Sequence, residues 1–339
     1  GRAAKRLAIS SGRDADTIHK ALEASVRETG RTYFERNEAN PLEEDLIIVD
    51  EASMLDISLF YHLLCALKDG ARLILVGDID QLPPVGAGEP LKDLMSWGYV
   101  PIVRLKRIFR QEEGSGIVEN AALIRKGEMC VPDEAGEFRI VYAADDEDAY
   151  RIVMDLCREL NYGNEENKML LQVLSPMYRG VCGVDHLNES LQEMIHGEKV
   201  PDGMKFFPGD KVMQTRNDYE KGIYNGDVGT VWTATPQKVF VRYFDKEVVY
   251  EGEERFDLRL AYAVTVHKSQ GSEYETVIFI LRPSQHNMLQ RNLLYTGVTR
   301  ARKNTILVTA PDALRRALAI QHTGNRYSLF LPFLNHEAL

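Results

Sequence analysis

Two short apolar runs with polar ends dominate the first third of the chain. Residues 46–49 read Leu-Ile-Ile-Val and end at Asp50, and residues 72–76 read Arg-Leu-Ile-Leu-Val and end at Gly77 and Asp78. Between them, residues 54–68 carry apolar side chains at helical spacing. Two strands that are apolar on all sides, joined by a helix, are typical of a parallel α/β sheet.

A second α/β pattern begins after about residue 112. An acidic run at residues 145–148 favours the N-terminus of a helix that continues to about Leu160, because carboxylates are stabilised there by the helix dipole. Apolar runs at residues 170–176, 276–280 and 305–308 predict buried strands, the last two flanking a helix.

Residues 205–255 have a different character, rich in Gly, Val, Thr and aromatic residues. The step Asn225-Gly226-Asp227 and the short alternating runs around it predict a small β-barrel inserted into the second α/β unit. Residues 26–36 alternate around Thr29-Gly30 and could form a short β-hairpin.

Composition limits the class of protein. A chain of 339 residues fits about two domains, and 44% apolar with 27% charged residues is ordinary for a globular protein. No apolar run approaches the length of a membrane span, and no signal peptide is recognisable, so we expect no membrane partner. Four scattered cysteines argue against zinc and disulfides, and for a reducing, cytoplasmic location.

The net charge of −10 excludes a uniformly basic surface. It still permits a local groove of Lys and Arg that binds nucleic acid, since the placement of charges matters more than their sum.

The candidate chemistry of the first unit lies where its two strands end. Asp50 could hold Mg²⁺ through water, and Glu51 could polarise an attacking water. After the second strand, Gly77-Asp78 predicts a tight turn, Gln81 could sense a terminal phosphate, and prolines 83 and 84 stiffen the loop. Two acids at an exposed strand end also occur by chance.

The second unit carries two further polar stretches. Residues 263–273, AVTVHKSQGSE, are expected to form a turn that presents hydroxyl, amide and backbone donors. In residues 294–302, LYTGVTRAR, one of the two arginines could place its guanidinium on a phosphate and neutralise developing charge. A surface helix that happens to carry Arg is the plainer alternative.

Taken in order, the strings IIVDEAS, LVGDIDQLPPV, LKRIFRQ, AVTVHKSQGSE and LYTGVTRAR resemble motifs II to VI of superfamily 1 helicases. The RecD/TraA branch, whose members are usually 5′-to-3′ DNA helicases, is the most similar. The strings GRAAKRL, SPMYRG, GVDHLNESLQ, PGDKVMQTRNDY and YNGDVGTV also resemble this branch, so the likeness covers nearly the whole chain.

The resemblance implies an α/β fold of two RecA-like P-loop NTPase-type domains, the first incomplete, with an inserted SH3-like β-barrel. The expected parts are residues 1–112, residues 113–204 with 256–339, and the barrel at 205–255. A hairpin within about residues 22–40 lies where this branch has a pin that splits the duplex. Tyr33 and Phe34 could stack on a base at the fork or pack under the hairpin.

The resemblance also implies a role for each matching residue, with ATP and Mg²⁺ as cofactors. Asp50 would bind the metal, Glu51 would act as the base, Gln81 would sense the γ-phosphate, and Arg110 and Arg300 would reach it. The other residues expected to contact the nucleotide are Gly77, Asp78, Gln270, Gly271 and Glu273. Those expected to contact single-stranded DNA or its junctions with duplex are Arg2, Thr17, His19, Pro83, Arg179, Asn217, Thr265 and His267.

One family motif is missing. The sequence holds no glycine-rich phosphate loop that ends in Gly-Lys-Ser/Thr. The family places this loop just before the GRAAKRL string, so we expect the chain to be the carboxyl-terminal portion of a longer DNA helicase in recombination or repair, and to hydrolyse ATP poorly by itself. The alternatives are a non-catalytic clamp on nucleic acid, part of a conjugative relaxase-helicase, and an RNA-directed helicase.

Overall fold

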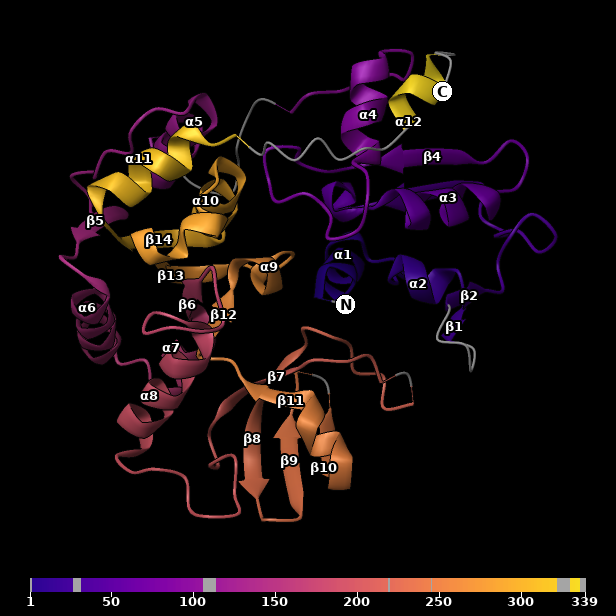
Figure 1. Cartoon of the computed structure of the whole chain (residues 1–339). Coiled ribbons are helices and arrows are strands. Elements are labelled where there is room, and N and C mark those ends of the chain that lie inside the picture. Colours follow the sequence, from indigo (N-terminus) through magenta and orange to yellow (C-terminus); the bar gives the residue numbers. More distant parts are fainter. Residues whose placement is uncertain are drawn as a thin grey trace. The chain divides into compact units, whose positions relative to one another are not determined.

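The computed structural model describes residues 2–26, 32–105, 114–218, 220–244, 246–321 and 330–335. They fall into two compact units (Figure 1), one formed by residues 1–107 with 323–339 and the other by residues 108–322. None of the described helices is both long and apolar enough to cross a membrane.

The first unit is built around two parallel strands. Its elements are α1 (Arg2–Ser11), α2 (Ile18–Ala21), β1 (Ala24–Val26), β2 (Thr32–Phe34), β3 (Leu46–Val49), η1 (Ala52–Met54), α3 (Ile57–Cys65), β4 (Arg72–Leu75), α4 (Pro90–Trp97) and α12 (Phe330–Leu334). Strands β3 and β4 pair in parallel from Leu46 opposite Arg72 to Val49 opposite Leu75. The two strands and the helix predicted between them are confirmed.

Only one face of this sheet is covered by the described residues. On that face, Val49 packs in a core with Leu63 of α3 and with Phe34 of β2. On the other face Leu46, Ile48 and Ile74 are 47%, 51% and 46% exposed. The prediction that both strands are buried on all sides is therefore wrong for the described residues, because their helices pack against one face alone.

The stretch expected to form a hairpin contains an antiparallel strand pair, β1 and β2, with Ser25 opposite Tyr33. Phe34 is buried, and its ring lies 4.6 Å from that of His62, so Phe34 packs under the strands and is not available to stack on a base. Tyr33 is half-buried. The tip of the hairpin, residues 27–31, lies outside the described residues.

The last described helix belongs to the first unit, whereas the sequence placed all of residues 256–339 in the second α/β domain. Helix α12 lies beside α4, where the indole nitrogen of Trp97 donates to the carbonyl of Leu334 at 3.1 Å. The ring of Phe330 packs edge-on against Phe60 at 5.8 Å. These contacts with Trp97 and Phe60 hold α12 on the first unit. They could not be predicted from the position of α12 at the end of the sequence.

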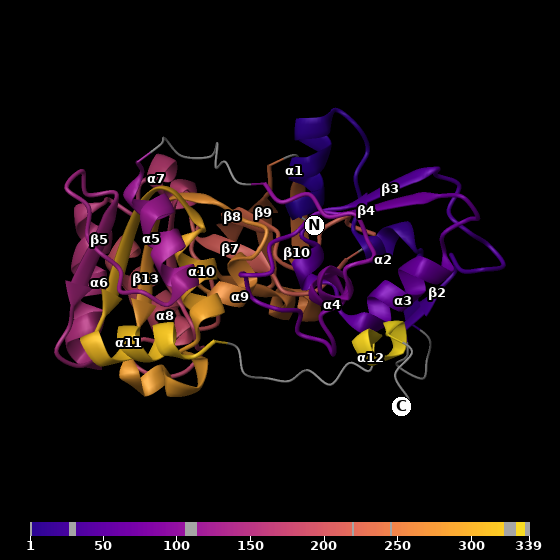
Figure 2. The same cartoon turned by 90° about the horizontal axis from the view of Figure 1, so that it is seen from above.

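The second unit contains a five-stranded parallel sheet in the order β12-β6-β13-β14-β5. Helices α5, α10 and α11 lie on one side of it and α6, α7 and α8 on the other (Figures 1 and 2). Its elements are α5 (Gly116–Lys126), β5 (Phe138–Tyr142), α6 (Asp146–Glu159), α7 (Glu165–Leu170), β6 (Leu171–Ser175), α8 (Val184–His196), β12 (Ala263–Thr265), α9 (Val266–Ser269), β13 (Tyr274–Leu281), η3 (Pro283–Met288), α10 (Arg291–Val298), β14 (Ala301–Thr309) and α11 (Pro311–Ala319).

The sequence explains several of these boundaries. The acidic run begins α6 as predicted, with the Asp145 carboxylate accepting from the amide of Asp148 at 2.8 Å. The three predicted apolar runs form β6, β13 and β14. The edge strand β12 is held by a side chain: the amide group of Asn188 donates to the carbonyl of Ala263 and accepts from its N–H, both at 2.9 Å.

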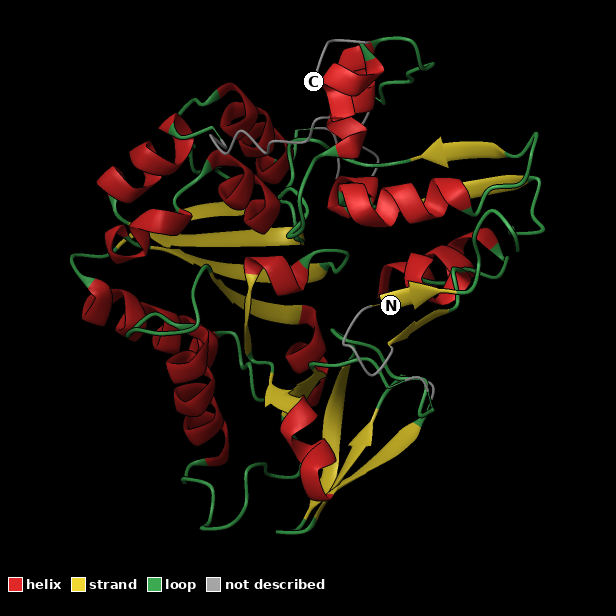
Figure 3. Cartoon of the chain, turned by 45° about the vertical axis from the view of Figure 1, so that its right-hand side comes forward, coloured by secondary structure: helices red, strands yellow, loops and turns green. Residues whose placement is uncertain are grey.

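Residues inserted between α8 and β12 form a five-stranded antiparallel sheet in the order β10-β9-β8-β7-β11, yellow like the other strands in Figure 3. Its elements are β7 (Lys211–Gln214), β8 (Val228–Ala234), β9 (Lys238–Arg242), β10 (Glu247–Glu251), η2 (Gly252–Asp257) and β11 (Leu258–Leu260). Its core is separate and includes Phe206, Val231 and Tyr250. Strand β11 extends this sheet past residue 255, where the sequence placed its end.

A buried carboxylate joins the inserted sheet to the α/β part. Asp210 is 0% exposed and accepts from Gln192 of α8 at 2.5 Å, from the amide of Phe207 at 2.7 Å and from the Tyr262 hydroxyl at 2.9 Å. His196 Nε2 lies 2.9 Å from the same carboxylate. Four partners, from α8, from the turn that enters the inserted sheet and from the residue before β12, therefore meet at one acid.

Candidate functional site

The predicted acid pair lies at the carboxyl end of β3. Asp50 is exposed, and its Oδ1 accepts from the amide of Glu51 at 2.9 Å. Glu51 has φ 52° and ψ 38°, the left-handed region that side chains other than Gly rarely adopt. A non-glycine residue held there costs of order 1–3 kcal/mol and is a feature of functional sites.

The turn after β4 lies directly beside the acid pair. The amide of Ala52 donates to the carbonyl of Val76 at 2.8 Å. A Cβ built on Gly77 would lie 2.9 Å from the Ser53 nitrogen and 2.8 Å from the Leu91 side chain. The chain can approach this closely only because residue 77 is glycine.

Asp78 shapes the loop that carries Gln81. Its carboxylate accepts from the amide of Asp80 at 3.0 Å, and its carbonyl accepts from the amide of Gln81 at 3.2 Å. The tight turn predicted for Gly77-Asp78 is therefore present. The carboxyl edge of parallel strands is where α/β folds bind ligands, and Asp50, Glu51 and Gln81 all follow strands that end at this edge.

The chemistry of this edge fits a divalent cation with its water. Asp50 offers an exposed carboxylate, and Glu51 follows it in a fixed turn. Oxygen ligands of one or two carboxylates plus water are what Mg²⁺ prefers. The phosphate groups of a nucleotide need a further cradle, because the 339 residues contain no loop of the Gly-Lys-Ser/Thr type.

In the second unit, Arg300 lies between α10 and β14 and is only 3% exposed. Its guanidinium donates to the carbonyls of Thr296 at 3.1 Å and Ser272 at 3.3 Å and to the Thr299 hydroxyl at 3.4 Å. Ser272 belongs to the turn that leads into β13, so the structure brings Arg300 together with the predicted nucleotide-contacting turn. Arg110 lies outside the described residues.

The stretch AVTVHKSQGSE forms the end of β12, the short helix α9 and a turn. Thr265 begins α9, with its hydroxyl accepting from the amide of Lys268 at 3.2 Å. His267 is half-buried in α9, and burial lowers its pKa. The turn from Gln270 to Glu273 contains Gly271 at φ 69° and reaches the amino end of β13.

A basic side chain of α9 reaches the inserted sheet. Lys268 Nζ donates to Asn225 Oδ1 at 2.6 Å, and the amide of Asn225 donates to Asn217 Oδ1 at 2.9 Å. Asn217 and the Thr265–His267 step, both predicted to contact DNA, are thus joined through two residues that sequence reasoning missed. Both residues lie within strings that resemble the family, but their contact could not be predicted because they are 43 positions apart in the chain.

The remaining predicted DNA-contacting residues are spread over both units. Thr17 caps α2 by accepting from the amide of Lys20 at 3.3 Å, and His19 is exposed with its ring 6.0 Å from Phe34. Pro83 is half-buried in the Gln81 loop, and Arg179 is exposed in the loop before α8. Arg2 begins α1, and its side chain lies outside the described part of the chain.

Three family models match successive parts of the chain. Residues 1–139 match an AAA domain, residues 187–243 match the SH3 domain of ATP-dependent RecD-like DNA helicases, and residues 260–308 match a UvrD-like helicase C-terminal domain. The SH3 match begins within α8 and covers β7, β8 and β9.

Curated relatives align with almost all of the chain. It is 37% identical over 333 residues to the ATP-dependent RecD2 DNA helicase of Deinococcus radiodurans, covering 97% of this chain and 44% of that protein. It is 32% identical over 339 residues to the RecBCD enzyme subunit RecD of Mycolicibacterium smegmatis, covering 94% of this chain and 60% of that one. The chain therefore spans about half the length of these relatives.

Solved structures agree on the fold. The Bacteroides Pif1 helicase in complex with ADP-AlF3 and single-stranded DNA has a TM-score of 0.54 at 21% identity, covering 97% of this chain and 84% of that one. The Pif1 helicase of Candida albicans has a TM-score of 0.52 at 19% identity, covering 87% of this chain and 77% of that one. At these identities the likeness shows a shared architecture of RecA-like sheets and an SH3 domain.

Proposed function

The chain belongs to the RecD-like helicase family, and from that premise we propose that it forms part of an ATP-driven motor that moves along single-stranded DNA and unwinds duplex. The observation that supports this most is the carboxyl edge of β3 and β4. There an exposed Asp50, a left-handed Glu51 and the Asp78-Gln81 turn are held together by a close backbone approach.

In the proposed reaction, Asp50 would hold Mg²⁺ and Glu51 would take a proton from the water that attacks the γ-phosphate. The left-handed turn supports this role for Glu51, because it ends the strand there and leaves two adjacent acids at the carboxyl end of β3. Gln81, in the neighbouring loop, senses the terminal phosphate. Gly77 and Asp78 form the turn that positions this loop beside the phosphate. Bound Mg²⁺ would supply charge neutralisation of the phosphates.

Arg300 is proposed to stabilise developing phosphate charge together with Arg110. In the structure, the Arg300 guanidinium donates hydrogen bonds to the carbonyls of Thr296 and Ser272. The contact with Ser272 therefore links Arg300 to the turn of Gln270, Gly271 and Glu273. A phosphate bound by Arg300 would be sensed by this turn through that contact.

The DNA strand is proposed to pass over the surface where α9 meets the inserted sheet. His267, Lys268, Asn225 and Asn217 offer an imidazole, an ammonium group and two amides there. Groups of this kind bind phosphates and base edges without strong sequence preference. The β1–β2 hairpin, with Tyr33 half-buried at its side, is proposed as the element that separates duplex at a junction.

By its family branch the motor is proposed to run 5′ to 3′ and to serve recombination or repair. The phosphate cradle is proposed to come from residues outside these 339, so that the chain alone turns over ATP poorly.

The decisive experiment is ATP turnover by the full-length protein with and without single-stranded DNA, for wild type and Glu51→Gln. We expect strong stimulation by DNA in wild type and a loss of at least about 100-fold in the variant, because a general base contributes about 10²–10⁴-fold. The matched control is Glu44→Gln, an exposed acid that precedes β3.

The outcome separates two functions. Stimulated turnover that disappears in Glu51→Gln but persists in Glu44→Gln supports the motor. Tight binding of single-stranded DNA with no turnover by wild type contradicts it and favours a non-catalytic clamp.

A further inference from the structure

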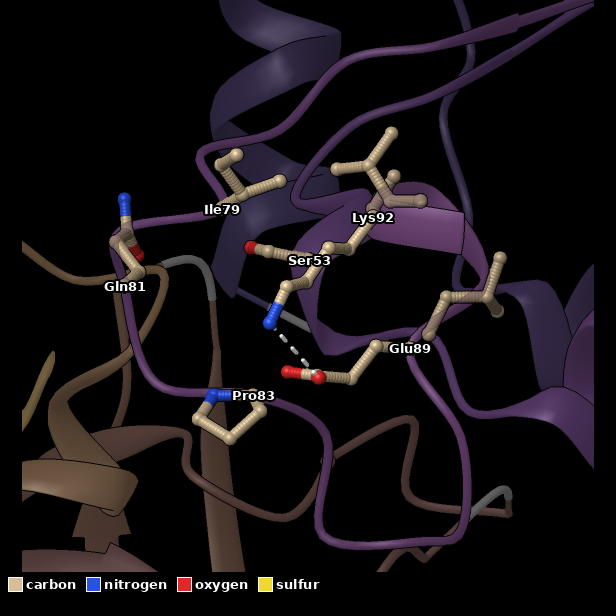
Figure 4. A pocket seen from close by; sticks show the side chains of 9 residues that line it. Ser53, Ile79, Gln81, Pro83, Glu89 and Lys92 are labelled. Atoms are coloured by element: carbon tan, nitrogen blue, oxygen red, sulfur yellow. Dashed lines mark hydrogen bonds and ion pairs between the residues drawn. The ribbon is translucent and has the colours of Figure 1, made fainter. Parts of the chain in front are cut away.

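A pocket opens beside the acid pair, within the first unit (Figure 4). Its wall includes Ser53 from η1, Ile79, Gln81 and Pro83 from the loop after β4, and Glu89 and Lys92 at the start of α4. Glu89 and Lys92 form an ion pair at 3.5 Å on one side of it. The pocket thus joins the two segments that carry the proposed base and the proposed phosphate sensor.

The hydroxyl of Ser53 is buried in this pocket. The residue is 8% exposed, and no side chain or backbone group among the described residues hydrogen-bonds to its Oγ. Figure 4 shows that the hydroxyl points to the side of the pocket where Ile79 and Gln81 lie. A buried hydroxyl without a partner is unfavourable, so native structures seldom retain one unless it has a use.

The backbone fixes Ser53 relative to Glu51. It lies in the 3₁₀ turn in which the amide of Met54 donates to the carbonyl of Glu51 at 2.9 Å and that of Leu55 donates to Ala52 at 3.1 Å. The close approach of Gly77 to the Ser53 nitrogen holds the same turn from the other strand. The backbone that carries the Ser53 side chain is therefore held in the same turn as the proposed base.

We propose that Ser53 is a positioning residue that orients the side chain of Gln81 when the site is loaded. The Ser53 hydroxyl donates to Oε1 of Gln81, and this directs the Nε2 donors of the same amide out of the pocket, toward the nucleotide. A serine hydroxyl can donate or accept. Because Oε1 is the buried atom of the Gln81 amide, the Ser53 hydroxyl acts as the donor and the Nε2 end is left to face the ligand. This inference rests on the proposed function, since it assigns a task to Ser53 only if Gln81 senses a phosphate.

The test is Ser53→Ala in the full-length protein. We expect the DNA-stimulated kcat to fall about fivefold to tenfold, the effect of one lost hydrogen bond in the transition state. The KM for ATP and the affinity for single-stranded DNA should stay within about twofold. The Tm of the nucleotide-free protein should be equal to or above that of wild type, because the substitution removes an unsatisfied buried group.

A double-variant cycle separates positioning from general packing. Ser53→Ala combined with Gln81→Ala should be no slower than Gln81→Ala alone, because the hydroxyl then has nothing left to orient. Ser58→Ala, an exposed serine on α3, is the matched control and should leave kcat unchanged.

Two results would overturn the inference while the motor function stands: an unchanged kcat in Ser53→Ala, or losses that multiply in the double variant. A lowered Tm in Ser53→Ala would also contradict it, because the hydroxyl would then be satisfied in the nucleotide-free protein. Failure of the proposed function itself is distinguishable, since wild type would then show no DNA-stimulated turnover at all.

Discussion

At the scale of single residues, the backbone of Glu51 is the most informative feature. The string Asp-Glu after an apolar strand indicates candidate acids, but it does not reveal that the second acid lies at φ 52°. Strain of this kind is maintained only where the surrounding structure imposes it. Here the Ala52–Val76 hydrogen bond and the close approach of Gly77 impose it, and both depend on a neighbouring strand.

His267 gives the chain a pH dependence whose sign follows from its burial. Burial lowers the pKa of His267 from its ordinary 6.5. As the pH falls below about 6.5, the unfolded chain binds a proton before the folded chain does, so stability is lost as the pH falls toward the lower folded-state value. His267→Asn should therefore show a smaller decrease in Tm between pH 7.5 and pH 5.5 than wild type. These pH values are about one unit either side of the ordinary pKa.

The measurement is thermal unfolding at the two pH values, with His286→Asn as control. His286 is exposed in η3 and provides a matched histidine-to-asparagine substitution. An equal decrease in Tm for His267→Asn and wild type would contradict the assignment.

At the scale of elements, Asp210 is a central contact between the inserted sheet and the α/β part. Asp210→Ala leaves the donors of Gln192 and Tyr262 buried without their acceptor. Burial raises the pKa of Tyr262, so its hydroxyl remains a protonated donor. Removing one partner of a buried network of this kind costs about 3 kcal/mol or more in the free energy of unfolding.

Denaturant unfolding of Asp210→Ala should show this loss of stability. The control is Asp202→Ala, because Asp202 is exposed in the loop before β7. Its free energy of unfolding should differ from that of wild type by less than about 0.5 kcal/mol. Equal stabilities for the two variants would show that the network does not hold the sheets together.

The elements themselves were predictable from sequence to an unequal degree. Strands β3, β6 and β13 appear where apolar runs predict them, because burial dictates their composition. The attachment of α12 to the first unit and the link from Lys268 to Asn225 were not predictable, since both join residues far apart in the chain. The candidate acids and Gln81 could be chosen from sequence, whereas Ser53 could not, because its isolation is a property of the packed pocket.

At the scale of the whole molecule, a net charge of −10 opposes binding to DNA at long range. The proposed contact with a strand would then depend on local cations such as Lys268, and affinity should fall with salt. For single-stranded DNA each phosphate contact contributes about −0.7 to the slope of log K against log salt, so Lys268→Ala should flatten that slope by about 0.7.

Titration of full-length Lys268→Ala with a fluorescent oligonucleotide at several salt concentrations measures this slope. Lys199→Ala, an exposed lysine in the loop after α8, should leave it unchanged. An unaltered slope for Lys268→Ala would remove α9 from the proposed DNA surface.

The uncovered face of β3 and β4 has a consequence for the temperature dependence of stability. Leu46, Ile48 and Ile74 are about half exposed in the folded first unit, so unfolding uncovers less new apolar surface from them than from a strand buried on both faces. The heat capacity of unfolding is reduced accordingly, since it rises by about 0.45 cal/mol/K for each Å² of apolar surface exposed. The stability curve of this chain is therefore flatter than that of a protein in which a further segment covers the same face. Such a protein would gain stability at its optimum and lose it more steeply on cooling and on heating.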